Sequence, residues 1–209
     1  MPKKLIINAD DFGVSKDINN GIMECYNNGA VTDISLLAVG DSFAHALNLA
    51  KKHNITKVGI HLALTGEFNA VKPANRIPSL VDKRNKFVKS FPGLVGKFLA
   101  GRINKEEIYA ELKAQILNIK KSGLDISHLD SHEHVHMFPP VLKIVLRLMR
   151  EERIRYIRFP LERISVKKRL ADPVNTLRSM ALYSMCILAR KLLKKSHINY
   201  NDSFIGHFH

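Results

Sequence analysis

Three polar segments of this 209-residue sequence carry residue types that could perform metal-assisted chemistry. Each accompanies a short apolar run that predicts a β-strand: Asp10-Asp11 after LIINA, His61 within GIHL, and a histidine-rich tract that begins at His128. In folds with parallel strands, active-site residues gather at the carboxyl ends of the strands. We therefore expect the three segments to meet at one edge of a sheet.

The tract HLDSHEHVH has His or Asp at every second position, namely 128, 130, 132, 134 and 136. Successive side chains of an extended chain point to opposite faces, so this pattern predicts one polar face. At about 3.3 Å per residue these positions span roughly 26 Å, too far for all of them to reach one ion. We expect one or two to bind a cation, and the others to bind substrate, orient ligands or transfer protons. A histidine-rich loop without such a role is the alternative.

The other two segments have plainer interpretations when each is taken alone. Adjacent acids after a strand, such as Asp10-Asp11, also occur in turns in which an Asp side chain bonds to the backbone. A single histidine in an apolar strand, such as His61, can be a hydrogen-bonded core residue. The case for chemistry rests on all three segments occurring together.

Asp11, His61 and one histidine of the tract form a set of two imidazoles and one carboxylate, which is typical of a hydrolytic metal site. A cation held in this way polarises a carbonyl or phosphoryl oxygen and lowers the pKa of water. Asp10, beside a ligand but not itself one, is the expected general base. The set suits Zn²⁺, while Mg²⁺ or Mn²⁺ with additional waters stays open.

The elements that must position these residues alternate between strand and helix. Strands are predicted at 4–9, 31–39, 57–62, 126–130 and 154–159. Helices are predicted at 15–28, 41–53, 104–123, 139–150 and 174–195. Residues 65–103 contain three prolines and several glycines, and we expect an irregular loop with short helical pieces. This alternation predicts an α/β fold with a mainly parallel sheet.

Helix start and stop signals support several of these boundaries. Ser15 is the expected N-cap of the first helix and Gly29 its stop, while Asp41 is the expected N-cap of the second helix. Asn104 and Glu107 resemble a capping box at the start of the helix over 104–123.

The composition excludes several classes of protein. Hydrophobic residues make up 45% and charged residues 25%, which is typical of a globular domain and excludes disorder as the main state. The only two cysteines, Cys25 and Cys186, exclude a disulfide scaffold. We predict that both are buried free thiols, which favours a cytoplasmic location. No signal peptide and no membrane-spanning segment are predicted.

The positive charge is concentrated in one part of the chain. Of a net charge of +14, residues 141–200 contribute 15 Lys and Arg against 4 Asp and Glu. Such an excess attracts anionic lipid, nucleic acid or an acidic substrate, and a solvated basic face is the alternative. Few aromatic residues and no Trp argue against a stacking platform for single-stranded nucleic acid, and we expect no nucleic-acid partner.

The segments NADDFG (8–13), GIHL (59–62) and HLDSHEHVHMFP (128–139) resemble, in order and spacing, the YdjC-like carbohydrate deacetylases, which include the chitooligosaccharide deacetylases. The resemblance implies one domain over residues 1–209 with a distorted, TIM-like (β/α) barrel. It implies that Asp11, His61 and His132 bind a divalent metal ion, Mg²⁺ or Zn²⁺, and that Asp10 is the base. The implied reaction removes the N-acetyl group of an amino sugar and releases acetate.

The remaining polar residues of the tract are expected to act on the substrate. Asp130 and His134 are the expected substrate-binding residues. His136 is the expected general acid that protonates the departing amine, with His134 as the alternative.

Two later segments, IRFPLE (157–162) and NDSFIGHFH (201–209), resemble the branch of the family associated with hopanoid biosynthesis. That branch implies a lipid-linked substrate with an N-acetylglucosaminyl group. The uncharged run at 179–189 predicts either an interfacial helix with a basic rim or a core helix of the barrel. A peripheral membrane contact through 174–195 and a homodimer are further expectations.

Family members usually continue for some tens of residues beyond a GHFH-like point. We therefore expect that this chain is either shortened at its C-terminal end or a short variant, and that the family's own general acid is absent from it.

Two other functions stay open at the level of the sequence. The first is a metal-dependent phosphoesterase drawn to anionic substrates by the basic segment at 141–200. The second is a non-enzymatic binder of membrane surfaces or nucleic acid, whose affinity would fall steeply with salt.

Overall fold

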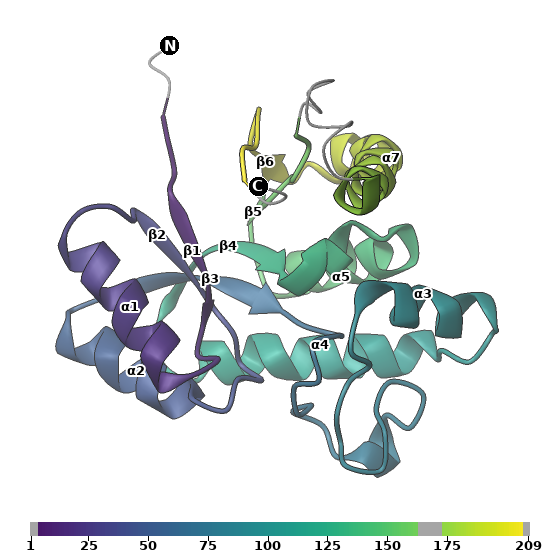
Figure 1. Cartoon of the computed structure of the whole chain (residues 1–209), viewed down its shortest axis with the longest axis horizontal. Coiled ribbons are helices and arrows are strands. Elements are labelled where there is room, and N and C mark those ends of the chain that lie inside the picture. The colour runs from purple at the N-terminus through teal and green to yellow at the C-terminus, as the bar shows by residue number, and fades with distance from the viewer. Residues whose placement is uncertain (1–3, 163–172, 207–209) are drawn as a thin grey trace. The chain divides into compact units, whose positions relative to one another are not determined.

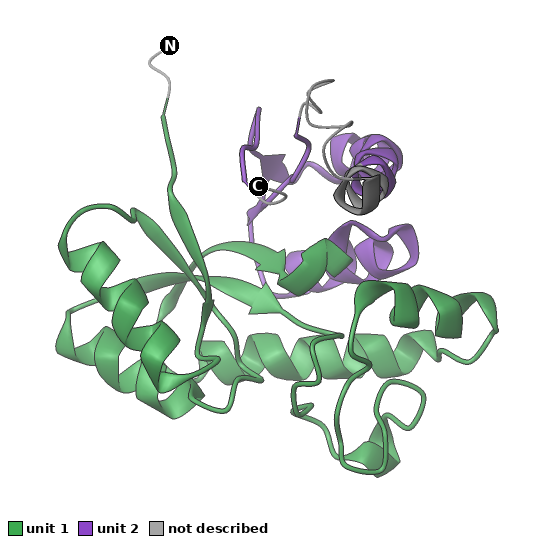
Figure 2. Ribbon diagram, in the orientation of Figure 1, with its two compact units in different colours: residues 1–135 green, residues 136–209 purple. Residues whose placement is uncertain are grey.

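The computed structural model describes residues 4–162 and 173–206 (Figure 1). The chain divides into two compact units, residues 1–135 and residues 136–209 (Figure 2). All three segments with metal-competent residues begin in the first unit.

Strands and helices alternate through the first unit (Figure 1). In chain order the elements are β1 (Asn8–Phe12), α1 (Lys16–Asn27), β2 (Asp33–Leu36), α2 (Phe43–Lys52), β3 (Lys57–Leu62), η1 (Ala74–Arg76), α3 (Phe91–Leu99), α4 (Lys105–Lys120) and β4 (Asp125–Ser131). A 3-10 segment, η2 (His132–Met137), follows β4. The four strands pair in the order β1-β2-β3-β4, and each pair is parallel. The predicted α/β class with parallel strands is confirmed, and the strands of this unit form an open sheet.

The core of the first unit lies around β3, which is buried from Val58 to Leu62. A parallel strand covered on both faces has this continuous burial. Helix α4 packs against β3 and carries an apolar stripe of four buried residues, namely Ile108, Leu112, Ile116 and Ile119. Helices α1 and α2 lie side by side in the same unit (Figure 1). This packing fixes β3, which carries His61.

The first strand differs from its prediction. We expected a buried strand over 4–9, but β1 begins at Asn8 and continues through both aspartates to Phe12. Leu5, Ile6 and Ile7 are exposed, and Leu5 has 79% of its surface accessible. The reason is pairing: the register with β2 starts at Asn8, opposite Asp33, so the apolar residues before it gain no covering strand.

The helix boundaries follow the predicted signals closely, with one correction. Ser15 accepts a hydrogen bond from the backbone of Ile18 as the N-cap of α1, and Gly29 has the positive φ typical of a helix stop. Asn104 caps α4 as expected. The N-cap of α2 is Ser42 and not Asp41.

Residues 65–103 form the predicted irregular loop with two short helical pieces, η1 and α3. Glu107, the expected second half of a capping box, accepts a hydrogen bond from the backbone N–H of Ser79 in this loop. The carboxylate thus ties the loop to α4.

The second unit contains α5 (Pro139–Glu151), β5 (Tyr156–Ile157), α7 (Pro173–Ser196) and β6 (Asn199–Tyr200). The two helices confirm the predictions at 139–150 and 174–195, and α5 packs against α7. The strand predicted at 154–159 is limited to two residues, which pair with β6 in parallel. Of the GHFH segment at 206–209, the last three residues lie outside the described part of the chain.

The two cysteines differ in their surroundings. Cys186 is buried as predicted, and burial raises the pKa of its thiol to about 12. Cys25 is exposed, which corrects the prediction. It lies on the outer face of α1, while Ile22 and Met23 of the same helix are buried.

Within the described residues, no helix has the length and apolar character needed to cross a membrane.

Candidate functional site

The two aspartates of β1 lie at an irregularity in the strand. Ala9 pairs with Ile34 and Phe12 pairs with Leu36, so two residues of β1 stand opposite one residue of β2. This count defines a β-bulge, and Asp11 has the positive φ of 64° that accompanies it. In a regular strand, adjacent side chains point to opposite faces. The bulge instead allows Asp10 and Asp11 each to bring a carboxylate oxygen within 4.8 Å of a ring nitrogen of His61.

His61, on the buried strand β3, contacts two carboxylates. Its Nδ1 lies 2.6 Å from Oδ1 of Asp130, which is its neighbour on β4 in the strand register. Its Nε2 lies 3.3 Å from Oδ1 of Asp11. A carboxylate that accepts the Nδ1 proton fixes the ring orientation and leaves Nε2 to act as a ligand.

The charges around His61 favour the form of its ring in which both nitrogens are protonated. Burial lowers the pKa of His61, but the charge of Asp130 and hydrogen bonds with Asp11 and Asp130 outweigh this and raise the pKa to about 10. Burial raises the pKa of Asp11, yet hydrogen bonds with His132 and His61 hold it well below its ordinary value. A cation bound at Nε2 of His61 would therefore replace the proton on that nitrogen, while Nδ1 keeps its proton toward Asp130.

His132 completes the group at the end of β4. Its Nδ1 lies 3.2 Å from Oδ1 of Asp11. The side chains of His132 and Asp11 are 26% and 35% exposed, so this side of the group opens to solvent. One ligand atom each from Asp11, His61 and His132 lie within 4.8 Å of one another. Two imidazoles and a carboxylate at such spacing fit a divalent cation with positions left for water or substrate.

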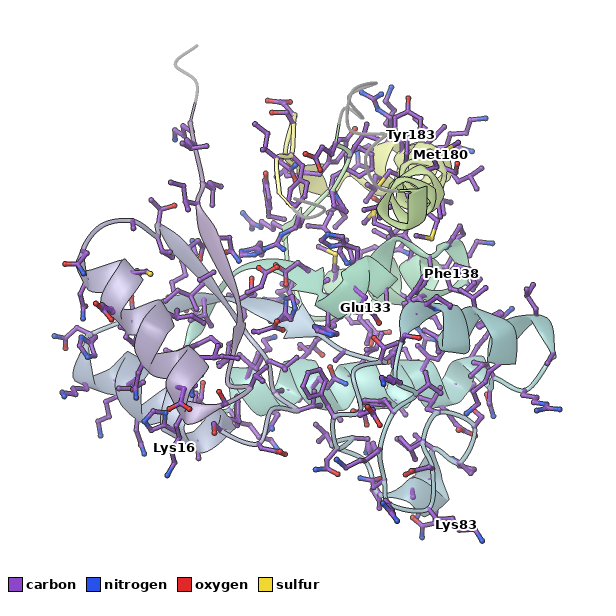
Figure 3. The ribbon with its side chains drawn as sticks, in the orientation of Figure 1. Lys16, Lys83, Glu133, Phe138, Met180 and Tyr183 are labelled. Atoms are coloured by element: carbon purple, nitrogen blue, oxygen red, sulfur yellow. The ribbon has the colours of Figure 1, made fainter. Side chains whose placement is uncertain are left out.

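The chain turns at His132, which corrects the prediction of an extended tract. Glu133 and His134 have positive φ values of 49° and 53° within η2. Glu133, which is labelled in Figure 3, accepts a hydrogen bond from the backbone N–H of Phe91 at the start of α3. The regular alternation of faces therefore holds only as far as β4 extends, and positions 134 and 136 do not continue the face that His128 and Asp130 share.

The predicted substrate residues of the tract are buried. Asp130 is fully buried, with one oxygen bonded to His61 and the other accepting a hydrogen bond of 2.7 Å from Ser35. This geometry favours a role in orienting His61. His134 is also buried. His136 opens the second unit, where its Nε2 donates to the backbone oxygen of Arg158 at 2.9 Å. Their predicted roles in substrate binding and acid catalysis stay predictions.

Asp10 is held by a residue that the sequence analysis missed. The amide of Asn8 donates to Oδ1 of Asp10 at 2.7 Å and to Oγ of Ser35 at 2.9 Å. A signal was available, since Asn8 and Asp10 share one face of a strand, as do Asp33 and Ser35. Polar residues at alternate positions of two apolar strands indicate a polar cluster.

Helix α4 holds the segment after β3 through two buried polar side chains. The amide of Gln115 bonds to both the N–H and the carbonyl of Ala63, at 3.0 Å and 2.8 Å. The Glu111 carboxylate accepts from the backbone N–H groups of Val71 and Lys72. Because the buried carboxylate accepts both bonds, it fixes the backbone at Val71 and Lys72.

This fixed segment carries Phe68, whose ring lies edge-on to His132 with 5.2 Å between the centroids. Gly66 lies beside both rings, and a Cβ there would come within 2.5 Å of Phe68. Phe68 therefore supports the one ring of the group that reaches solvent. Nothing in the spacing of the sequence pointed to this residue.

Comparison with known proteins adds independent observations. A family model described as YdjC-like protein matches residues 4–209. Three proteins named carbohydrate deacetylase are similar to the chain: one from Brevibacillus brevis (42% identity over 75% of this chain), one from Geobacillus stearothermophilus (40% over 74%) and one from Vibrio parahaemolyticus (37% over 72%). The matched segments cover 59%, 59% and 57% of those relatives, so the chain spans less than two thirds of their length.

A solved structure shares the fold. The crystal structure of an Enterococcus faecalis V583 protein with a proposed role in cellobiose-phosphate cleavage aligns with 96% of this chain and 97% of its own. The TM-score is 0.68 and the sequence identity 23%, a likeness that concerns the fold alone.

Proposed function

The chain belongs to the YdjC-like protein family, and from this premise we propose that it is a metal-dependent carbohydrate deacetylase. The proposed reaction removes the acetyl group from an N-acetylated amino sugar. The names of its relatives support the class of reaction. The observation that carries the proposal is the convergence of Asp11, His61 and His132 within 4.8 Å, beside Asp10.

The proposed cofactor is a divalent cation, Zn²⁺ or Mg²⁺, bound by Asp11, His61 and His132. Two histidines and one carboxylate are donors that suit Zn²⁺, and Mg²⁺ would need additional waters. When bound, the cation supplies Lewis-acid polarisation of the acetyl carbonyl and lowers the pKa of water.

The chain's own residues supply the proton transfers in this proposal. The carboxylate of Asp10 accepts a proton from the water that attacks the acetyl carbon. Asn8 holds Asp10 for this step through the bond of 2.7 Å to Oδ1. The amide C–N bond then breaks, an acid donates a proton to the departing nitrogen, and acetate and a free amino sugar result. His136 is the predicted acid, and His134 and Asp130 are the predicted substrate-binding residues.

The finer details of substrate and location are further parts of the proposal. The substrate is proposed to be an oligosaccharide or, as the hopanoid-associated branch implies, a lipid-linked amino sugar. Contact with a membrane surface through α7 is supported by its exposed apolar residues. A homodimer and a cytoplasmic location stay predictions.

Acetate release from N-acetylated chito-oligosaccharides tests the proposed activity. With Zn²⁺ or Mg²⁺ added, the whole chain should release acetate, and Asp10→Asn should lower kcat by roughly 10²–10⁴-fold, as expected for loss of a general base. The same variant should still bind the cation. Asp17→Asn, a change at an exposed acid in the first turn of α1, is the matched control and should keep full activity.

A parallel panel of phosphoesters provides the contradicting outcome. Phosphate release without acetate release would replace this proposal with a phosphoesterase. Full activity of Asp10→Asn would overturn the role of Asp10 as the base.

A further inference from the structure

His128 is a buried histidine on β4 that the reaction proposed above does not use. Its Nε2 lies 3.1 Å from Oγ of Ser35 and 3.3 Å from Oδ2 of Asp130. Its Nδ1 lies 2.8 Å from Oγ of Ser127 and 3.4 Å from Oδ2 of Asp33. Both ring nitrogens therefore have oxygen partners, although the ring itself is out of solvent.

The ring of His128 lies against the backbone of β3 at Gly59. A Cβ at position 59 would come within 2.3 Å of Cε1 of His128 and within 2.6 Å of its Nε2. Real Cβ contacts are not this short, so only glycine leaves room for the ring in this position. A glycine inside a strand commonly marks such a close approach. In the GIHL segment, Gly59 thus leaves room for the ring of His128, and His61 follows two residues later.

Ser35 joins the groups around His128 into one network. Its single hydroxyl proton goes to Oδ2 of Asp130, and its oxygen accepts from the amide of Asn8 and from Nε2 of His128. These three bonds use the full capacity of a serine hydroxyl. The hydrogen-bond roles are consistent only when His128 donates from Nε2.

The protonation state of His128 agrees with this direction of bonding. Burial lowers the pKa of His128, but hydrogen bonds with Asp130 and Asp33 and the charges of these acids outweigh it and raise the pKa to about 9. The charged groups that contact the ring are Asp33 on β2 and Asp130 on β4, while β3 lies against it with Gly59. At neutral pH both ring nitrogens therefore carry protons to donate.

Asp130 connects His128 to His61 of the metal group through its two carboxylate oxygens. Oδ1 accepts a hydrogen bond from Nδ1–H of His61, while Oδ2 accepts hydrogen bonds from the hydroxyl of Ser35 and from Nε2–H of His128. A fully buried carboxylate with both oxygens bonded has one orientation, and this orientation directs Nε2 of His61 toward Asp11. Without His128, Asp130 would lose its positive partner on the Oδ2 side.

We propose that His128, seated against Gly59, is a positioning residue that holds Asp130 so that His61 presents Nε2 to the metal group. The inference rests on the proposed function, since it assigns a purpose to the orientation of His61. Partners that orient a ligand in this way commonly affect metal affinity or activity by about 10–100-fold.

Two variants test the proposal from opposite sides. His128→Asn removes the ring, and Gly59→Ala leaves His128 in the sequence but removes its space. Gly21→Ala is the matched control, because a Cβ at this α1 position meets nothing within 4 Å. For both test variants we expect the Kd for Zn²⁺, measured by competition with a chromophoric chelator, to rise about 10–100-fold. The control should stay within twofold of the wild type.

A second readout reports on His61 without any metal. In the metal-free protein, the Nδ1 proton of His61 should give a downfield NMR resonance that exchanges slowly with water, because Asp130 holds it at 2.6 Å. The resonance is assigned by its disappearance in His61→Ala. In His128→Asn and Gly59→Ala we expect at least tenfold faster exchange of this proton, while circular dichroism shows the native helix content.

The Kd and the exchange rate together decide whether His128 positions His61. Unchanged exchange of the His61 proton and unchanged Kd in both variants would overturn the proposal. Loss of the fold in both variants would also overturn it, because His128 would then serve stability alone. If the wild type binds neither Zn²⁺ nor Mg²⁺, the proposed function fails, but the exchange rates still decide whether His128 positions His61.

Discussion

Two adjacent residues of the same type have different surroundings at this site. Asp11 contacts both histidines of the candidate metal group, while Asp10 is bonded by the amide of Asn8. The bulge in β1 is the physical cause, because a regular strand would turn one of the two carboxylates away. The proposed division between a ligand and a base therefore depends on one extra residue in the strand.

Substitution of the histidines tests the ligand set at this scale. We expect His61→Ala and His132→Ala to lose bound metal, with a fall in affinity of more than about 100-fold, beyond the effect of an indirect partner. The measurement is metal content by mass spectrometry after dialysis. His53→Ala, at the C-cap of α2, is the control and should retain the metal. Stoichiometric metal in both test variants would refute the ligand assignment.

Among the elements, α7 has two different faces. The face toward the interior of its unit carries four buried residues, namely Leu182, Cys186, Ala189 and Leu193. The outer face exposes Met180, Tyr183, Ile187 and Leu188 by 40% to 59%, and Figure 3 labels the first two. Arg190, Lys191, Lys194 and Lys195 follow on exposed positions. An apolar stripe followed by cations is typical of a helix that lies at an anionic lipid surface.

Vesicle binding tests this interpretation of α7. We expect the chain to sediment with phosphatidylglycerol vesicles and to bind phosphatidylcholine vesicles weakly, because the lysines and arginines need anionic lipid. The double variant Ile187→Asp/Leu188→Asp should lower binding by at least about tenfold, since it removes two apolar side chains that each contribute roughly 1–2 kcal/mol when partly buried.

Leu99→Asp, a change at an exposed leucine at the end of α3, is the control and should bind as the wild type does. Equal binding of the double variant, or equal binding to both kinds of vesicle, would show that α7 does not mediate membrane contact.

Charge is divided unequally over the whole molecule. Residues 1–135 carry 18 Lys and Arg against 14 Asp and Glu, while residues 136–209 carry 15 against 5. The first unit also contains two histidines, His61 and His128, whose pKa values are raised to about 10 and about 9. These two histidines should therefore contribute to the pH dependence of the stability of the metal-free protein.

The stability of the metal-free protein should depend on pH accordingly. A histidine whose folded pKa is raised stabilises the fold fully below its unfolded value of about 6.5, and this contribution is lost as the pH rises toward the folded value. With chelator present we expect Tm to fall between pH 6.5 and 10, measured at high ionic strength to screen the net charge. A Tm that stays constant or rises over this range would contradict the predicted protonation of His61 and His128.

Comparison with His61→Gln isolates the contribution of His61. This variant lacks the titrating ring, so its loss of Tm over the same pH range should be smaller than that of the wild type. Added Zn²⁺ should also reduce the alkaline loss in the wild type, because a bound cation takes the place of the proton on His61.

The sequence by itself determined those features that depend on local periodicity and residue type. Strand β3 has the predicted bounds, 57–62, and the N-cap of α4 at Asn104 was predicted from residue type and spacing. The sequence also indicated that Asp11, His61 and a histidine of the tract would meet, because carboxyl ends of parallel strands share an edge.

Tertiary structure alone decided how those groups face one another. The pairing of β1 with β2 left Leu5 exposed and created the bulge at Asp10 and Asp11. The turn at Glu133 ended the alternation that the histidine tract suggested. The network around Asp130 likewise depends on strand register, which is set by contacts between residues far apart in the chain. Local patterns carry no information about such contacts, and for this reason the orientation of each ligand could not be obtained from the sequence.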